Sequence, residues 1–249
     1  MTAREAVRQA NAPSMKPLQL LFQSSIGKKI LMGATGAALL LFVVGHLVGN
    51  LQIFLPKEHI NAYAHLLHSK PALLWAVRGG LLFVVGLHVW AAISLTLENR
   101  AARPAGYAAG TTPYASTWAG RHMLMTGLIV AAFVVYHLLH YTAQVTAINL
   151  TGQDFTALVV QGGPQAGYKD VHRMLILGFS QPLVSLFYLV AIGLLCFHLS
   201  HGASSMFQSL GMQEGAWRQR LERVARVAAI AIFAGYASIP LAIFLRLVQ

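Results

Sequence analysis

The sequence predicts an all-α membrane protein, a bundle of five transmembrane helices. Of its 249 residues, 56% are hydrophobic and only 10% are charged, and its mean hydropathy is +0.59. Such a composition is typical of membrane proteins. Five stretches contain no charged residue, and each is long enough to cross a bilayer core, which takes about 20 helical residues. The stretches are residues 30–55, 79–97, 123–153, 174–213 and 227–245.

The expected helices follow one another with short connections, so residues 25–249 form one transmembrane domain behind a polar N-terminal tail, residues 1–24. The basic N-terminal segment has no apolar region of the kind found in signal peptides, and the first apolar run has no obvious cleavage site. The first helix is therefore retained and is not a signal peptide. In the fourth stretch Pro182 removes a backbone hydrogen bond and predicts a kink after Gln181. We expect that helix to end near Ser200–Gly202. The fifth has no histidine and reads as a structural brace.

The net charge of +11 follows the membrane topology. If the N-terminus is cytoplasmic, twelve basic residues lie inside and six outside, which the positive-inside rule favours. The C-terminus is then outside, and no nucleic-acid role is needed. An inner basic face also suits a soluble partner. A single cysteine, Cys196, excludes an internal disulfide, and no Cys-x-x-Cys-His motif indicates covalent haem.

Four of the eleven histidines lie inside the first four uncharged stretches, one in each: His46, His88, His137 and His198. A histidine in hydrocarbon costs free energy unless it is paired or ligated. The first and third helices share the pattern Thr-Gly-x9-His, at Thr35–His46 and Thr126–His137. Both helices run from inside to outside, so the two repeat histidines are expected at equal depth.

Depth sorts the four histidines into two pairs. At about 1.5 Å per residue, His46 lies about 25 Å beyond Lys29 and His137 about 24 Å beyond Arg121. His88 lies about 18 Å from Arg100, and His198 lies near the inner end of its helix. The sequence therefore predicts an outer pair, His46 with His137, and an inner pair, His88 with His198.

Two neutral imidazoles in an apolar bundle suit haem iron. Structural zinc needs four close ligands and a di-iron site needs Glu-x-x-His pairs, which these helices lack. Small residues leave room for a flat macrocycle: Gly33, Gly36, Gly45, Gly49 and Gly127. The alternative is that the histidines are hydrogen-bonded between helices and the glycines serve ordinary packing. His140 rivals His137 as a ligand, and His201 rivals His198.

Four segments carry a resemblance: GHLVGN at 45–50, NAYAH at 61–65, LHVW at 87–90 and FHLSHG at 197–202. They resemble the single-chain, five-helix, dihaem cytochrome b anchor subunit of bacterial succinate:quinone oxidoreductases and fumarate reductases. The resemblance covers nearly the whole chain from about Ser25 onward. It implies two b haems, with His46 and His137 as axial ligands of the outer one and His88 and His198 of the inner one.

The resemblance also implies a bacterial plasma-membrane complex. A flavoprotein carrying FAD and an iron–sulfur protein would dock on the cytoplasmic face, complexes could associate as trimers, and this chain would hold no succinate site. Electrons would pass from the inner haem to the outer haem and on to quinone, with menaquinone favoured over ubiquinone. Some fumarate-reducing members have a carboxylate where this chain has Cys196, which weakens the case for a proton route there and favours an inert core thiol.

In that family the menaquinone site lies near the outer haem, which draws attention to Glu58 as a proton relay and to His65 and His68 on a short helix. Solvated loop residues are the alternative. An inner quinone site is also open, from Ser25 and Lys28, with Ser24, Arg121 and Trp217 nearby. Arg78, about two turns inside the second helix, is a candidate partner for a propionate of the outer haem.

Three other functions stay open. The chain could be the dihaem cytochrome b of a hydrogenase or formate dehydrogenase, or the same anchor working in the direction of fumarate reduction. The remote alternative is a haem-free transporter, which would line a path with polar groups and break helices at the membrane midplane.

Overall fold

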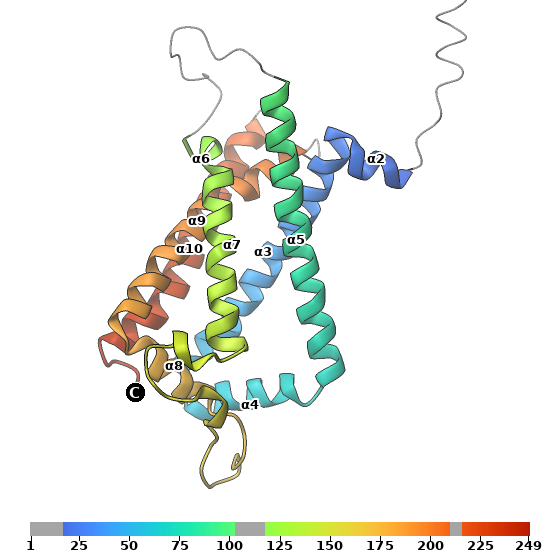
Figure 1. Cartoon of the computed structure of the whole chain (residues 1–249). Coiled ribbons are helices and arrows are strands. Elements are labelled where there is room, and N and C mark those ends of the chain that lie inside the picture. Colours follow the sequence, from blue (N-terminus) through green and yellow to red (C-terminus); the bar gives the residue numbers. More distant parts are fainter. Residues whose placement is uncertain (1–16, 103–117, 210–215) are drawn as a thin grey trace, which may run out of the picture.

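The computed structural model describes residues 17–102, 118–209 and 216–249, which are mostly helical (Figure 1). These residues form no β-strand, apart from one isolated bridge between Val159 and Lys169. The elements are α2 (Pro17–Gln23), α3 (Ser25–Asn50), η1 (Leu51–Phe54), α4 (Lys57–His68), α5 (Pro71–Ala101), α6 (Trp118–Arg121), α7 (Met123–His137), η3 (Leu138–Thr142), η4 (Thr146–Ile148), η5 (Phe155–Ala157), α8 (Val171–Phe179), α9 (Pro182–Ser209) and α10 (Ala216–Phe244).

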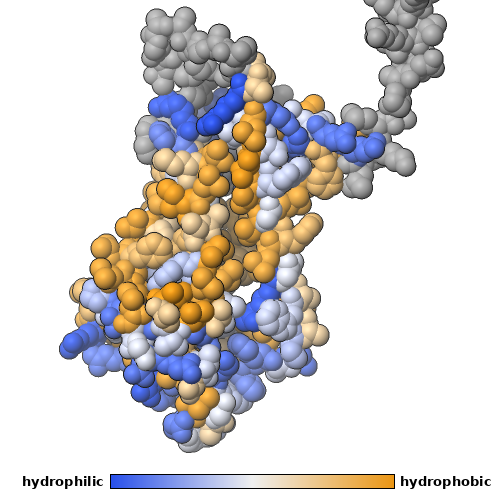
Figure 2. All heavy atoms as spheres, viewed as in Figure 1, coloured by the Kyte–Doolittle hydropathy of each residue, from blue (hydrophilic) through white to orange (hydrophobic). Residues whose placement is uncertain are grey.

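Five helical segments are long and apolar enough to cross a membrane: Ser25–Phe54, Pro71–Ala101, Met123–Thr142, Pro182–Ser209 and Trp217–Phe244. This confirms the five predicted helices and gives the chain the build of a multi-pass membrane protein. Helices α3, α7 and α10 run in one direction, and α5 and α9 in the other (Figure 1). Apolar side chains cover the middle of the molecule and polar ones gather towards its two ends (Figure 2).

Local signals set where several helices begin. The Ser24 hydroxyl caps α3 by accepting a hydrogen bond from Gly27 N at 3.0 Å, and the Asp170 carboxylate caps α8 by accepting one from Arg173 N at 3.0 Å. Proline opens α5 and α9, where its missing N–H costs nothing. Of the predicted tail, residues 17–23 form α2, and residues 1–16 lie outside the described residues.

Two expectations for the fourth stretch are corrected. At Gln181-Pro182 the chain does not kink a helix but separates α8 from α9, and the Ser185 hydroxyl donates to Phe179 O at 2.5 Å across the break. The expected end at Ser200–Gly202 is wrong, because α9 continues to Ser209. The Ser200 hydroxyl donates to Phe197 O within its own helix at 2.7 Å, and one glycine inside a helix costs only about 1 kcal/mol.

The third stretch is also shorter as a helix than predicted. Helix α7 ends at His137 and passes into a π-helical turn, Leu138–Thr142, after which the chain leaves the helix well before residue 153. Gln144 and Leu150 have φ angles of 55° and 56°, and the Asn149 side chain accepts from Thr151 N at 2.9 Å. These turns contain no charge, so the uncharged run extends past the helix. Single π turns inside helices are often found at functional sites.

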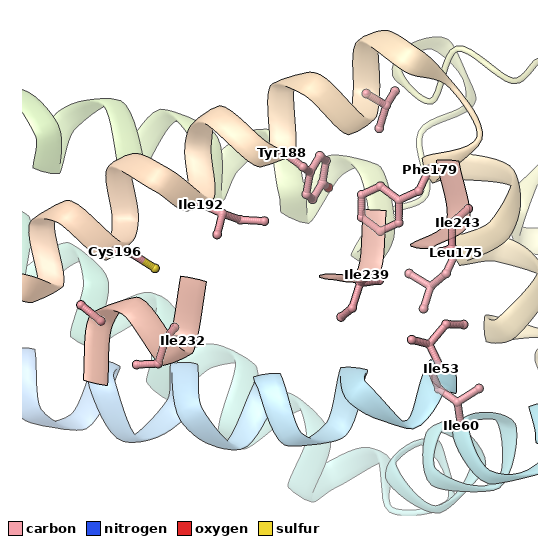
Figure 3. Close-up of a cluster of buried hydrophobic side chains, with 12 residues drawn as sticks. Ile53, Ile60, Leu175, Phe179, Tyr188, Ile192, Cys196, Ile232, Ile239 and Ile243 are labelled. Atoms are coloured by element: carbon pink, nitrogen blue, oxygen red, sulfur yellow. The ribbon is translucent and has the colours of Figure 1, made fainter. Parts of the chain in front are cut away.

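The core lies between α9, α10 and the connecting elements η1, α4 and α8 (Figure 3). Tyr188, Ile192 and Cys196 of α9 pack with Ile232 and Ile239 of α10, so Cys196 is a buried thiol in an apolar cluster, as favoured from the sequence. Helix α10 also packs against α3.

Burial is uneven across the five spans. In their most apolar windows, α9 and α10 have 33% and 39% of residues buried, against 11% in both α5 and the span of α7. In Figure 2 the surface is hollowed between α5 and α7. In these two helices, therefore, few apolar side chains are buried, and most are partly or fully exposed.

Candidate functional site: two histidine pairs

The inner pair consists of His88 on α5 and His198 on α9. Their ring centroids are 6.5 Å apart, with the ring planes at 71°. Each ring is held through Nδ1 by a threonine of a neighbouring helix. Thr35 Oγ1 on α3 lies 3.0 Å from His88 Nδ1, and Thr126 Oγ1 on α7 lies 3.3 Å from His198 Nδ1.

The glycine after each threonine makes space for the same histidine. A Cβ added at Gly36 would lie 3.3 Å from His88 Cε1, and one added at Gly127 would lie 3.1 Å from His198 Cε1. Both distances are tighter than ordinary van der Waals contact. In each copy of the internal repeat, the Thr-Gly pair therefore contacts and makes room for a histidine ring. The ring comes from the next membrane-length helix along the chain.

The outer pair consists of His46, one turn before the end of α3, and His137 at the end of α7. Their ring centroids are 5.8 Å apart, with the planes at 82°. His137 Nδ1 lies 3.3 Å from the Tyr188 hydroxyl. His46 stacks on Phe42 at 5.3 Å and lies 3.3 Å from the side-chain amide of Asn50.

The rival His140 occupies a different place. It is fully buried, its Nδ1 lies 3.1 Å from the Tyr188 hydroxyl, and its Nε2 has no hydrogen-bond partner among the described residues. Its ring packs against Tyr141 and Phe155, whereas His46 contacts the ring of His137. His88 likewise contacts the ring of His198, and His201 is the next turn along. The structure thus brings together the two pairs that depth predicted. Their role as ligands remains a prediction.

The spacing within each pair fits two imidazoles that share one metal ion. A metal–imidazole bond is about 2 Å long, which places two opposed ring centroids about 6 Å apart, and the two pairs measure 5.8 and 6.5 Å. Among residues 17–102, 118–209 and 216–249, no three or more His, Cys, Asp or Glu side chains come together as a metal site. The donor set therefore suits haem, which needs only two axial protein ligands.

The two pairs lie at different depths in one rigid frame. Thr35 marks the level of His88, and His46 follows eleven residues later on α3; the same spacing separates Thr126 from His137 on α7. Eleven helical residues correspond to about 17 Å along the axis. Both α3 and α7 therefore contribute to both sites.

The other glycines expected to admit the macrocycle are corrected in part. A Cβ at Gly49 would come within 2.9 Å of the Tyr63 ring, so this glycine allows close packing of that ring. A Cβ at Gly33 would lie at an ordinary contact distance of 3.7 Å from Met206, so the space there is already occupied by α9. Gly45 has nothing within 4 Å and stays compatible with a bound group.

The outer quinone candidates lie on α4, which confirms the short helix expected there. The His65 ring stacks on Tyr168 at 3.6 Å, while His68 Nδ1 lies 2.7 Å from Ala64 O in its own helix. Glu58 is exposed, and its backbone carbonyl accepts from Gln165 Nε2 at 2.9 Å. The contacts of these three residues are separate, and the one given for Glu58 is made by its backbone, so they do not form one site.

The inner candidates Ser25 and Lys28 meet a residue that sequence reasoning missed. Lys28 is 8% exposed and forms an ion pair with Glu98 on α5, and Ser25 Oγ donates to the same carboxylate at 3.2 Å. The Lys28 ammonium lies 6.0 Å from the Trp90 ring. A possible signal was that Glu98 is the one acidic residue of the second helix.

The remaining inner and propionate candidates have other surroundings. Trp217 is 64% exposed and lies beside Arg220, with the guanidinium 5.8 Å from the ring. Ser24 is the cap of α3. Arg78 lies two turns inside α5, as predicted, and its guanidinium is 5.1 Å from the Trp75 ring.

A buried asparagine joins α4 to the start of α8. Asn61 on α4 is 1% exposed, accepts from His172 N at 3.0 Å and donates to Asp170 at 3.2 Å. His172 is buried behind it, and burial lowers the pKa of its imidazole against the opposing effect of Asp170. This network fixes α8 against α4.

Comparison with protein-family models, with curated proteins and with solved structures finds no match for this chain. The family resemblance therefore depends on the sequence motifs, and the case for the site depends on the geometry of the histidines.

Proposed function

We propose that this chain is a dihaem cytochrome b, the membrane-anchor subunit of a succinate:quinone oxidoreductase. The observation that supports this most is the pairing of four histidines from four membrane-length helices, at spacings of 5.8 and 6.5 Å. Histidines are costly in hydrocarbon, and two bis-histidine centres account for all four at once.

Haem b, when bound, supplies reversible one-electron transfer. The protein's part is to hold and tune the two centres. His46 and His137 would hold the outer haem, and His88 and His198 the inner one. The apolar side chains of α5, α7 and α9 would set the dielectric surroundings of the haems, which control the reduction potential.

The partners follow from the proposed orientation. The proposed topology puts twelve basic residues of the sequence on the inner side and six on the outer side, and an iron–sulfur subunit and its FAD-bearing flavoprotein would dock on that inner side. Electrons would enter through the inner haem and leave from the outer haem to menaquinone in a bacterial plasma membrane. This chain takes no part in the chemistry of succinate itself.

The helix pattern lends less support to a transporter. The break between α8 and α9 lies at one end of the bundle, next to the outer connections, rather than at mid-depth (Figure 1). Transporters of the broken-helix type interrupt helices near the midplane.

The test uses membranes that contain the chain with its native partners. We expect succinate to reduce the b-type haems and a menaquinone analogue to reoxidise them, both followed by the absorbance band of reduced haem b. Reduction by hydrogen or formate, with no response to succinate, would assign the chain to a hydrogenase or formate dehydrogenase instead. Faster turnover from reduced quinone to fumarate than from succinate to quinone would assign the fumarate-reducing direction. Membranes without any b-type band would leave the transporter.

A further inference from the structure

The two threonines beside the inner histidines have already used their hydrogens. Thr35 Oγ1 donates to carbonyls of its own helix, at 2.8 Å from Leu31 O and 3.1 Å from Met32 O. Thr126 Oγ1 does the same, at 3.0 Å from His122 O and 3.1 Å from Met123 O. A hydroxyl has one hydrogen and two lone pairs. Each threonine therefore presents a lone pair to the histidine ring.

This arrangement sets the tautomer of both histidines. Since the threonine oxygen accepts, the ring nitrogen 3.0 Å away in His88 and 3.3 Å away in His198 must carry the proton. That nitrogen is Nδ1 in both rings. A neutral imidazole protonated at Nδ1 has its lone pair on Nε2, the atom that binds metal.

The glycines make room for this orientation. A Cβ at Gly36 or Gly127 would lie 3.3 or 3.1 Å from Cε1 of the ring, so a larger residue would crowd the ring in its position beside the threonine. The outer histidines lack this arrangement: His137 contacts the phenol of Tyr188, and His46 contacts the amide of Asn50. Among the four histidines, only the two of the inner pair therefore lie beside a threonine followed by a glycine.

We propose that Thr35 and Thr126 are positioning residues that fix His88 and His198 as Nε2 ligands of the inner haem and tune its potential. The proposal rests on the proposed function, since it requires a haem between these two rings. A ligand histidine that donates its other N–H becomes a stronger donor through Nε2. A stronger donor stabilises oxidised iron over reduced iron, so both hydrogen bonds lower the midpoint potential of the inner haem.

The experiment measures both haem potentials by spectroelectrochemical titration of the purified holoprotein, together with the low-spin EPR signals. The variants are Thr35→Val and Thr126→Val, which keep the side-chain shape and remove the acceptor, and Thr35→Ser, which restores a hydroxyl. Thr96→Val is the matched control, because the Thr96 hydroxyl on α5 donates to its own helix at Ala92 O. The inner haem is identified as the one lost in His88→Ala.

We expect both valine variants to shift the inner potential upward and to change one EPR signal, with the outer haem unchanged. Thr35→Ser and Thr96→Val should match the wild type. An inner haem with the same potential and EPR signal in both valine variants as in Thr96→Val would overturn the proposal. If Thr35→Val does not accumulate, Thr126→Val carries the test, since both act on one haem. A wild-type chain without haem would refute the proposed function itself, whereas two haems with unaffected valine variants would refute this proposal alone.

Discussion

Thr35 Oγ1 lies 3.0 Å from Nδ1 of His88, although the two residues are 53 positions apart. The contact joins α3 to α5 at the level of the inner pair, and eleven residues further along α3 is His46 of the outer pair. Helix α7 repeats the arrangement with Thr126 and His137. The two centres are therefore held at a fixed separation by two helices that each serve both.

Single histidine variants should remove haems one at a time. With two ligands needed for each haem, His46→Ala or His137→Ala should lower the content from two haems per chain to one, and His88→Ala or His198→Ala should remove the other haem. The haem content of the purified variants and the EPR signal that disappears provide the measurement.

Two further variants decide between ligand and rival. Exposed His65 is the control, and His65→Ala should keep both haems. His140→Gln should also keep both, because its ring packs against Tyr141 and Phe155 and not against His46. Loss of the outer haem in His140→Gln, with its retention in His137→Gln, would reverse the assignment.

Breaking the Lys28–Glu98 pair should destabilise the packing of α3 on α5. Lys28 is 8% exposed, so Glu98→Gln leaves a buried ammonium without its counter-charge and should lower the melting temperature. Adding Lys28→Met to that variant should recover most of the loss, because no unpaired charge remains. Thermal unfolding in detergent follows both.

The exposed ion pair of Arg218 and Glu222 is the control for that experiment, with side chains 52% and 36% exposed. Arg218→Gln should leave the melting temperature nearly unchanged, since exposed pairs contribute little. Equal effects of Glu98→Gln and Arg218→Gln would show that burial of Lys28 has no energetic weight.

Replacing Gly235 on α10 with alanine should crowd the side chain of Leu47 on α3. Its Cβ would lie 2.9 Å from Cδ2 of Leu47, a buried side chain next to His46. Such overpacking costs about 1–3 kcal/mol. Leu47→Ala in the same chain should suppress the effect, which a double-mutant cycle measures as coupling. Gly80→Ala, with nothing within 4 Å, should show no loss.

The contact between α4 and α8 should weaken as the pH falls. Burial lowers the pKa of His172 below its ordinary value of 6.5, with Lys57 acting in the same direction and Asp170 and Glu58 opposing it. The unfolded chain then takes up its proton first, so this stability is complete above pH 6.5 and declines as the pH falls toward the lower, folded-state pKa.

The difference in melting temperature between about pH 7.5 and about pH 5 should be larger in the wild type than in His172→Gln. An equal pH dependence in the two proteins would show that His172 does not contribute to it. Comparing the two chains removes the contributions of the other histidines.

The five helices could be predicted from the sequence because a membrane span depends mainly on the length of an apolar run. The outer pair could be predicted as well, because Thr-Gly-x9-His occurs in two helices that run in the same direction. The inner pair was placed partly by a helix end expected at Ser200–Gly202, which the structure moves to Ser209. The ends of helices that lie inside uncharged runs could not be predicted from the sequence. The π turn after His137 and the continuation of α9 through Ser200–Gly202 involve no charged residue, so hydropathy does not register them.

The partners of the histidines were beyond the sequence too. Thr35 and Thr126 were visible in the repeat, yet their contact with His88 and His198 depends on how the helices are packed. The position of Tyr188 between His137 and His140 is a tertiary contact of the same kind. Glu98 was visible as a lone acid, but its pairing with Lys28 required the packing of α3 on α5.

The central claim is that each histidine pair holds one haem. The most direct measurement is the haem stoichiometry of the purified chain by pyridine haemochrome, with a reduced-minus-oxidised spectrum. We expect two b-type haems per chain, resolved as two steps in a redox titration. A chain folded in membranes with haem available that contains none would contradict it and leave the four histidines as packing residues.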